Sequence, residues 1–308
     1  MKIMTQRLIR IAVLAVLSGT LAVAAVPQDA VKPAPPLSIH YEELTGPDFI
    51  RAVAASEATC IIPVGILEKH GPHLPLGTDL FECRAISERA ADKEYTIVFP
   101  AYYFGQIFEA QHQPGTMAYS AQLILDLLQE TCDELARNGL KKIIIVNGHG
   151  GSEQLCQYFC QIQLARAKDY AVYLFQPEED PAREAQIDKL RRTTLDGHAG
   201  EMETSQMLVI RPDLVHLDRA DEQSGEDLKR LADLKNAYTG IWWYASYPNH
   251  YQGYGSAGRK ELGELALSVK TDYLVEMIRS VKKDTATLSL QKRFFGEAEH
   301  PLDTAQKK

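Results

Sequence analysis

The sequence predicts an α/β protein, a three-layer α/β/α sandwich with a mainly parallel central sheet. Short β-rich runs alternate with longer segments whose apolar residues recur at helical spacing, which is typical of strand-helix-strand units. The run from Ile143 to Val146 is apolar at consecutive positions, as expected of a strand covered on both faces. The chain has 308 residues, 45% of them hydrophobic, which is enough for one large domain.

Four short segments are expected to form the strands. They are rich in β-branched and aromatic residues, which fit a buried pleated surface. In parallel sheets covered by helices, the loops that leave the carboxyl ends of the strands form the ligand crevice. The expected strands are residues 59–64, 95–100, 142–146 and 170–175.

Helices are expected between these strands and after them. The segment 121–138 places Ile124 and Leu128 on one face, and Gly139 follows as a typical C-terminal stop. The expected helices are residues 80–93, 121–138, 153–168, 181–191, 198–210 and 261–282.

The first residues resemble a secretory signal peptide. A basic start is followed by an apolar stretch and by the small-x-small pattern of residues 22–24. An uncleaved anchor is the alternative, but the stretch is too short to span about 30 Å of hydrocarbon. We therefore expect export, into the bacterial periplasm, with no stable membrane insertion after cleavage. The expected organisation is a signal peptide at 1–24, a Pro-rich leader at 25–40, one folded domain at 41–285 and a polar tail at 286–308.

Charge and cysteine content narrow the function further. The formal net charge of −8 argues against nucleic acid or anionic lipid as the partner, so a small molecule is expected. Five cysteines occur, without a CxxC pair. Cys60 and Cys132 fit buried thiols, while Cys156 and Cys160 are four apart on an expected helix. This pattern disfavours a zinc-thiolate site and allows at most one disulfide.

The first chemically unusual loop is residues 65–79, after the first expected strand. Glu68 and His70 are two apart, so in an extended segment both side chains project to one side. The Gly- and Pro-rich stretch that follows can fold Asp79 back toward them. Two carboxylates and an imidazole suit a divalent metal. Alternatively, Asp79 only caps the following helix.

The second loop, residues 147–152, follows the apolar strand and places His149 between glycines, where backbone and imidazole can approach a ligand closely. It fails as a dinucleotide fingerprint because Glu153 occupies the third glycine position. A lipase-type site is also excluded, because the chain has no G-x-S-x-G. A structural histidine at a strand end stays the alternative.

The third stretch, residues 196–205, opens a helix and contains His198, Glu201 and Glu203. Acids in a first helical turn are favoured by the helix dipole alone. Three clusters of histidine and carboxylate on separate loops nevertheless favour one shared site, because each can bind metal or move protons.

These loops belong to a longer series of sequence blocks. The blocks are PVG at 63–65, EKHGPHLPLGTD at 68–79, HQPGT at 112–116, NGHGG at 147–151, HAG at 198–200 and ETS at 203–205. In their order and spacing, across residues 44–282, the sequence resembles the creatininase family of metal-dependent amidohydrolases.

The resemblance implies a layered α/β/α fold and a centre of two divalent ions, Zn²⁺ or Mn²⁺, that hydrolyses a C–N bond in a small cyclic or linear amide or lactam. Neighbouring branches of the family cleave peptides or formamides. A non-catalytic periplasmic protein that binds metal or a small molecule is the alternative from another class. The resemblance also implies a homo-oligomer, with a hexamer as the family's frequent form.

Carried over by position, Glu68 and His149 would hold one ion and His70 the other, with Asp79 bridging both. Glu203 is the candidate for the remaining carboxylate ligand.

Two further residues are expected to act in catalysis. His198 matches the family histidine that shuttles a proton to the leaving nitrogen, and Glu201 is the second catalytic candidate and the substitute for Glu203. The sequence departs from the family pattern at two positions. Gly151 stands where creatinine-cleaving members have a glutamate, so creatinine becomes doubtful as the substrate. Lys69 replaces a glutamine and is expected to point away from the metals.

Overall fold

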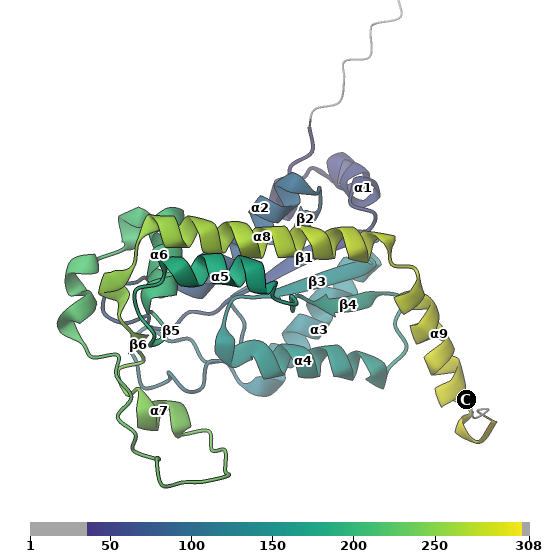
Figure 1. The fold of residues 1–308 in the computed structure, drawn as a ribbon. Helices are drawn as coiled ribbons and strands as arrows, with labels where there is room; N and C mark the ends of the chain where they lie inside the picture. Colours follow the sequence, from purple (N-terminus) through teal and green to yellow (C-terminus); the bar gives the residue numbers. More distant parts are fainter. Residues whose placement is uncertain (1–35, 304–308) are drawn as a thin grey trace, which may run out of the picture. The chain divides into compact units, whose positions relative to one another are not determined.

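The computed structural model describes residues 36–303, and one compact unit begins at Leu37 (Figure 1). The predicted signal peptide, residues 1–24, and most of the predicted leader lie outside the described residues. The end of that leader belongs to the folded unit, because Val98 donates a backbone hydrogen bond to Ile39.

The central sheet has four parallel strands in the order β2-β1-β3-β4. In the register of β1 and β3, Ile62 lies opposite Ile145. Every residue of β1 is buried, as expected of a strand with helices on both faces. The strands are β1 (Thr59–Val64), β2 (Ile97–Val98), β3 (Lys142–Asn147) and β4 (Ala171–Leu174).

Helices cover both faces of the sheet, which confirms the predicted three-layer α/β/α sandwich (Figure 1). Alternate strand residues point to opposite faces. Cys60 and Ile62 pack in a cluster with α3 (Ala121–Arg137) and α4 (Glu153–Ile162). Ile61 and Ile144 pack on the other side, with the two helices α2 (Thr78–Lys93) and α8 (Lys260–Lys283).

Four further helices and a small antiparallel ribbon belong to the same unit. Both α5 and α6 contact α8. The helix expected at 198–210 begins later, at Glu201, because residues 196–198 pair with a strand from the C-terminal half. The remaining bounds are α1 (Gly46–Ala55), α5 (Pro181–Leu190), α6 (Glu201–Ile210), α7 (Trp242–Ser246), β5 (Asp196–His198) and β6 (Gln252–Gly253).

The segment assigned to a polar tail contains a helix. α9 spans Ala286–Ala298, and the Asp284 carboxylate accepts hydrogen bonds from the amides of Ala286 and Thr287 at its start. All five cysteines lie in the described part of the chain and have free thiols. Among residues 36–303, no helix combines the length and apolarity that crossing a membrane requires.

The fold brings the loops after β1 and β3 together at the carboxyl edge of the sheet. Gly148 donates its backbone N–H to the Val64 carbonyl at 2.8 Å. A Cβ on Gly148 would lie only 2.5 Å from the Asp79 carbonyl oxygen, so only glycine permits this close approach. The start of α2 therefore packs directly on the loop that carries His149.

Candidate metal centre

The structure brings together the five residues predicted as metal ligands. Glu68 and His70 lie in the loop after β1, Asp79 in the first turn of α2, His149 after β3 and Glu203 in the first turn of α6. They form two groups whose ligand atoms lie within 4.8 Å of one another, and both groups contain Asp79.

The first group consists of Glu68, Asp79 and His149. His149 Nδ1 lies 3.0 Å from Glu68 Oε1 and 3.4 Å from Asp79 Oδ2. Glu68 Oε1 and Asp79 Oδ2 are buried and have no hydrogen-bond partner, despite these short separations. Buried carboxylate oxygens are costly to leave unpaired, so their convergence fits a divalent cation between them.

The second group consists of His70, Asp79 and Glu203. His70 Nε2 lies 3.1 Å from Asp79 Oδ1 and 3.9 Å from Glu203 Oε2. On the other side of the ring, Nδ1 lies 3.2 Å from the Glu68 carbonyl oxygen, to which it can donate. A metal-binding histidine commonly donates its second nitrogen in this way, which leaves Nε2 for a cation.

Glu203 is held at the centre by a strained turn. Its Oε2 accepts a hydrogen bond from the backbone N–H of Ala199. Ala199 has φ +55°, a left-handed conformation that costs energy for a residue with a Cβ. The strain is thus located where the chain turns a backbone amide toward a carboxylate of the cluster.

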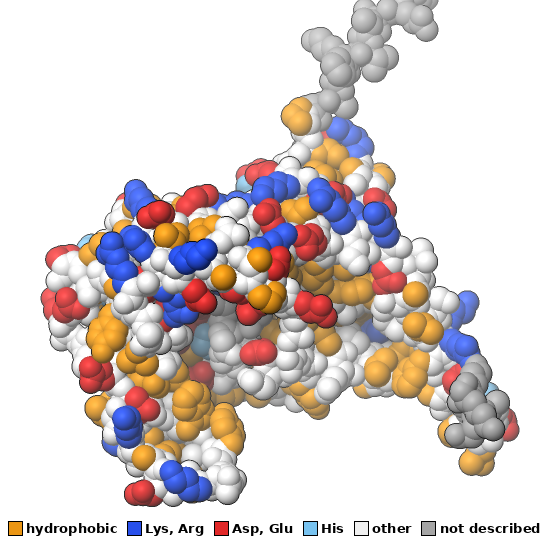
Figure 2. All heavy atoms as spheres, in the orientation of Figure 1, with side chains coloured by type: hydrophobic (Ala, Val, Ile, Leu, Met, Phe, Trp, Pro, Cys, Tyr) orange, Lys and Arg blue, Asp and Glu red, His pale blue; other side chains and the backbone are white. Residues whose placement is uncertain are grey.

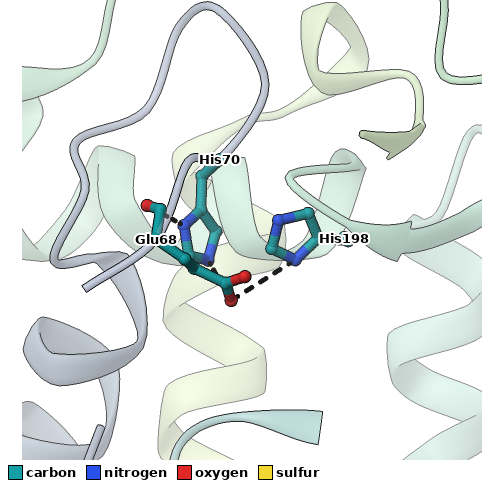
Figure 3. Close-up of side chains that lie close together, drawn as sticks. All are labelled: Glu68, His70 and His198. Carbon is teal, nitrogen blue, oxygen red and sulfur yellow. Dashed lines mark hydrogen bonds and ion pairs between the residues drawn. The ribbon is translucent and has the colours of Figure 1, made fainter. Parts of the chain in front are cut away.

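His198 lies beside the two groups with its ring centroid 4.3 Å from that of His70, and Figure 3 shows both rings next to the Glu68 carboxylate. Its Nε2 donates to the Lys69 carbonyl at 2.9 Å, while Nδ1 lies 3.9 Å from Glu68 Oε1. This orientation leaves Nδ1 available to exchange a proton. A third possible ligand group combines His198 with Glu68 and His70.

Burial and mutual charge shift the pKa values of the cluster. Burial lowers the pKa of His198 to about 3, so the imidazole is neutral at pH 7. Burial also opposes a charge on His70, but the Asp79 carboxylate outweighs it and raises the pKa of His70 to about 10. Burial raises the pKa of Glu203 to about 7. A cation would take the place of the protons that these groups hold.

Glu201 lies elsewhere, contrary to the role in catalysis or metal binding predicted for it. Its carboxylate accepts hydrogen bonds from the backbone amides of Arg192 and Thr193 and from the Thr193 hydroxyl, all within 2.9 Å. Residues two apart on a helix point in different directions, so only one of Glu201 and Glu203 can face the cluster. Through these hydrogen bonds Glu201 instead holds residues 192–193, before β5, in place.

Sequence reasoning missed His250 and its partner. His250 Nε2 forms a short contact with Glu68 Oε2, and Trp243 Nε1 donates to His250 Nδ1 at 2.7 Å. His250 is buried and has φ +52°, a second left-handed non-glycine residue at the centre. The aromatic-rich segment around it was visible in the sequence, but no motif separated its histidine from the aromatic residues.

A pocket of about 1290 Å³ opens onto Asp79, His149, His198 and Glu203. Its outer part is aromatic, and Figure 2 shows hydrophobic side chains gathered around α7. Among the described residues that line the pocket there is no lysine or arginine. Lys69, as expected, points elsewhere and donates to Gln223 and to the Asn249 carbonyl.

Comparison with known proteins agrees with this site. The family model for creatininase, described as creatinine amidohydrolase, matches residues 42–278. Creatinine amidohydrolase of Pseudomonas putida is 29% identical over 196 residues, which are 59% of this chain and 75% of the relative. A 3-dehydro-scyllo-inosose hydrolase of Thermotoga maritima is 24% identical, over 80% of this chain and 84% of the relative. A mycofactocin precursor peptide peptidase of Mycolicibacterium smegmatis is 33% identical, over 51% and 60%.

Solved structures show the same fold. A structure named as the Mn form of creatininase has a TM-score of 0.66 at 25% identity, and the match covers 80% of this chain and all of that one. A mutant creatininase of the Zn-Zn type has a TM-score of 0.67 at 24% identity, with 81% of this chain covered and all of that one. Fold and site thus define a hydrolase with a metal-binding cluster at the sheet edge. The chain belongs to the creatininase family.

Proposed function

We propose that this protein is a binuclear metal-dependent hydrolase that cleaves a C–N bond in a small cyclic or linear amide. The observation that carries the proposal is the sharing of Asp79 by two ligand groups, each with a histidine and a second carboxylate. Zn²⁺ and Mn²⁺ both accept such ligands. The similar creatininase structures named as Mn and Zn-Zn forms support the same pair.

The ions would supply a water that ionises near neutral pH and a Lewis acid for the amide oxygen. The chain's own residues then complete the reaction. His198 presents Nδ1 to the cluster, where it can take a proton from the attacking water and return it to the leaving nitrogen. The hydrogen bond from Nε2 to the Lys69 carbonyl fixes the tautomer that this step requires.

The pocket supports a neutral or cationic substrate. Its carboxylates include those of Asp79, Glu109 and Glu203, and its described lining offers no lysine or arginine for an anion. Trp242, Trp243 and other aromatic side chains present flat apolar surfaces to a ring or side chain. Creatinine itself is disfavoured, because Gly151 replaces the glutamate of creatinine-cleaving members.

A peptide is the second candidate, and the size of the pocket favours it. At about 1290 Å³ the pocket exceeds the roughly 300–1,000 Å³ that small-ligand sites occupy. The 33% identity to the mycofactocin precursor peptide peptidase points in the same direction. A peptide substrate would thread along the aromatic part of the pocket to reach the cluster.

The direct test is a screen of cyclic amides, linear amides and short peptides against protein loaded with Zn²⁺ or Mn²⁺. Asp79→Ala serves as the blank. We expect metal-dependent hydrolysis in the wild type and none in the variant. Activity that survives in Asp79→Ala would place the reaction elsewhere, while two bound ions without any turnover would support a binding protein instead.

Export and self-association are also proposed. The signal-like pattern of residues 1–24 supports a periplasmic location. Exposed apolar side chains near α7, such as Tyr238 and Ile241, support a homo-oligomer, with a hexamer as the family precedent. N-terminal sequencing of the secreted protein and light scattering of the purified protein test these two proposals separately.

A further inference from the structure

The loop after β2 is docked on the turn that carries His149. The Gln106 backbone N–H donates to Ser152 Oγ at 3.0 Å, and Ser152 Oγ lies 3.2 Å from the Gln106 carbonyl, to which it donates. Ser152 is fully buried. A Cβ on Gly105 would lie 2.6 Å from Ile66 Cγ2, so the loop approaches too closely for any other residue there. This docking fixes the position of the following residues.

Glu109 is the acidic residue that this loop presents to the cluster. Its Oε2 accepts a hydrogen bond of 2.8 Å from Gln106 Nε2, and its Oε1 lies 3.7 Å from His149 Nε2. The side chain is 19% exposed and lines the pocket. His149 Nε2 is buried and has no hydrogen-bond partner. An unpaired ring nitrogen therefore faces a carboxylate oxygen that lies about 0.5 Å beyond the usual hydrogen-bond distance.

The missing side chain at Gly151 makes room for this carboxylate. A Cβ on Gly151 would lie 2.3 Å from Glu109 Oε1 and 2.5 Å from His149 Nε2. The space that any side chain at position 151 would enter is thus filled by Glu109.

The two nitrogens of His149 have different surroundings. Nδ1 faces Glu68 and Asp79, the first ligand group, whereas Nε2 faces the Glu109 carboxylate. A metal-binding histidine is held in its productive tautomer by a carboxylate on its second nitrogen. We propose that Glu109 is the positioning residue for His149: it accepts the Nε2 hydrogen and leaves Nδ1 for the cation. This inference rests on the proposed two-metal function.

The test measures the two stepwise dissociation constants for Zn²⁺ by competition with a chelator. We expect Glu109→Ala to weaken one step by about 10- to 100-fold and to leave the other unchanged. Glu109→Gln should weaken the same step less, since its amide oxygen still accepts a hydrogen bond. Glu153→Gln is the matched control, because this acid is exposed on α4 close to His149 and should change neither step.

A second variant keeps the test valid if Glu109→Ala does not fold. Gln106→Ala removes only the amide that holds Glu109 Oε2, while the backbone contacts of Gln106 with Ser152 stay intact. It should weaken the same step by a smaller factor than Glu109→Ala. Equal weakening of both steps, or no change in either, would overturn the role of Glu109 while the proposed function stands. A wild type that binds fewer than two ions would overturn both.

Discussion

The pocket has two walls that differ in composition and exposure. The inner wall consists of the predicted ligands Asp79, His149 and Glu203, and the two other predicted ligands, Glu68 and His70, are fully buried against them. The outer wall consists of Phe108, Tyr238, Trp242, Trp243 and Tyr244, all of which except the half-buried Trp243 are exposed. Buried carboxylate oxygens at the inner wall have no hydrogen-bond partner, which fits a bound cation. The outer wall instead offers apolar aromatic surface to a substrate. The groups that would carry out the reaction and the groups that would select the substrate thus lie on different walls of one pocket.

The largest expected effect is that of Asp79→Ala, which breaks the inner wall at the residue that both ligand groups share. Both ions should be lost, and with them several kcal/mol of transition-state stabilisation, about 10³-fold or more in kcat/KM. Metal analysis and hydrolysis assays on the same sample check this. A variant that keeps two ions would show that Asp79 does not bridge them.

His198→Gln should separate catalysis from metal binding within the inner wall. The variant removes the proton carrier, so kcat should fall about 10²-fold or more. The metal content should stay that of the wild type, because His198 lies outside the two groups that share Asp79. If the variant loses an ion, His198 is a ligand of the third group, with Glu68 and His70, rather than a proton carrier.

Glu201→Gln and Glu203→Gln compare the two acids in the first turn of α6. Glu201 accepts hydrogen bonds from Arg192 and Thr193, so the amide should cost about 1–3 kcal/mol of unfolding free energy and leave the metal content unchanged. Glu203→Gln should do the reverse and lose one ion. Chemical denaturation and metal analysis of both variants distinguish the two roles. A loss of metal in Glu201→Gln would show that Glu201 contributes to the metal centre.

Trp243→Phe tests whether the two walls are coupled. The Trp243 indole donates a hydrogen bond to His250, and His250 contacts Glu68. The phenyl ring keeps the apolar surface but leaves His250 Nδ1 without its donor. We expect a loss of about 10-fold in kcat/KM, the equivalent of one neutral hydrogen bond. Trp242→Phe, on the exposed side of the outer wall, is the control and should change mainly KM. An equal effect of both variants on kcat would contradict the link.

The smallest effect is expected far from both walls. Asp284 caps α9, and its hydrogen bond with Thr287 holds the pKa of the carboxyl at about 2, below its ordinary value. Its contribution is therefore present at pH 4 and above and is lost as the pH falls toward 2. Asp284→Ala should reduce the unfolding free energy by about 1 kcal/mol at pH 7 without changing activity. Denaturation at pH 7 and pH 3 checks the sign; a larger loss at pH 3 would contradict it.

The sequence predicted the inner wall better than the outer one. The strands that end at Val64 and Asn147 follow from uninterrupted apolar runs, and ligand loops at their ends follow from the rules of parallel sheets. His250 and Glu109 could not be found in this way. Each lies in an irregular segment and reaches the cluster only through a long-range contact, of His250 with Glu68 in one case and of Gln106 with Ser152 in the other. Local patterns do not encode such contacts.

The helical ends show a similar limit. The pattern at 198–210 predicted one helix, but pairing of β5 with β6 takes its first residues and delivers His198 from a strand. That pairing depends on a partner more than fifty residues later in the chain. α9 was missed: none of its residues is buried, and its start is fixed by the Asp284 cap.

The central claim is that Asp79 lies between two cations, and anomalous diffraction from crystals grown with Zn²⁺ tests it most directly. The account predicts two peaks, one bounded by Glu68, Asp79 and His149 and the other by His70, Asp79 and Glu203. A single peak, or no peak beside Asp79, would contradict it.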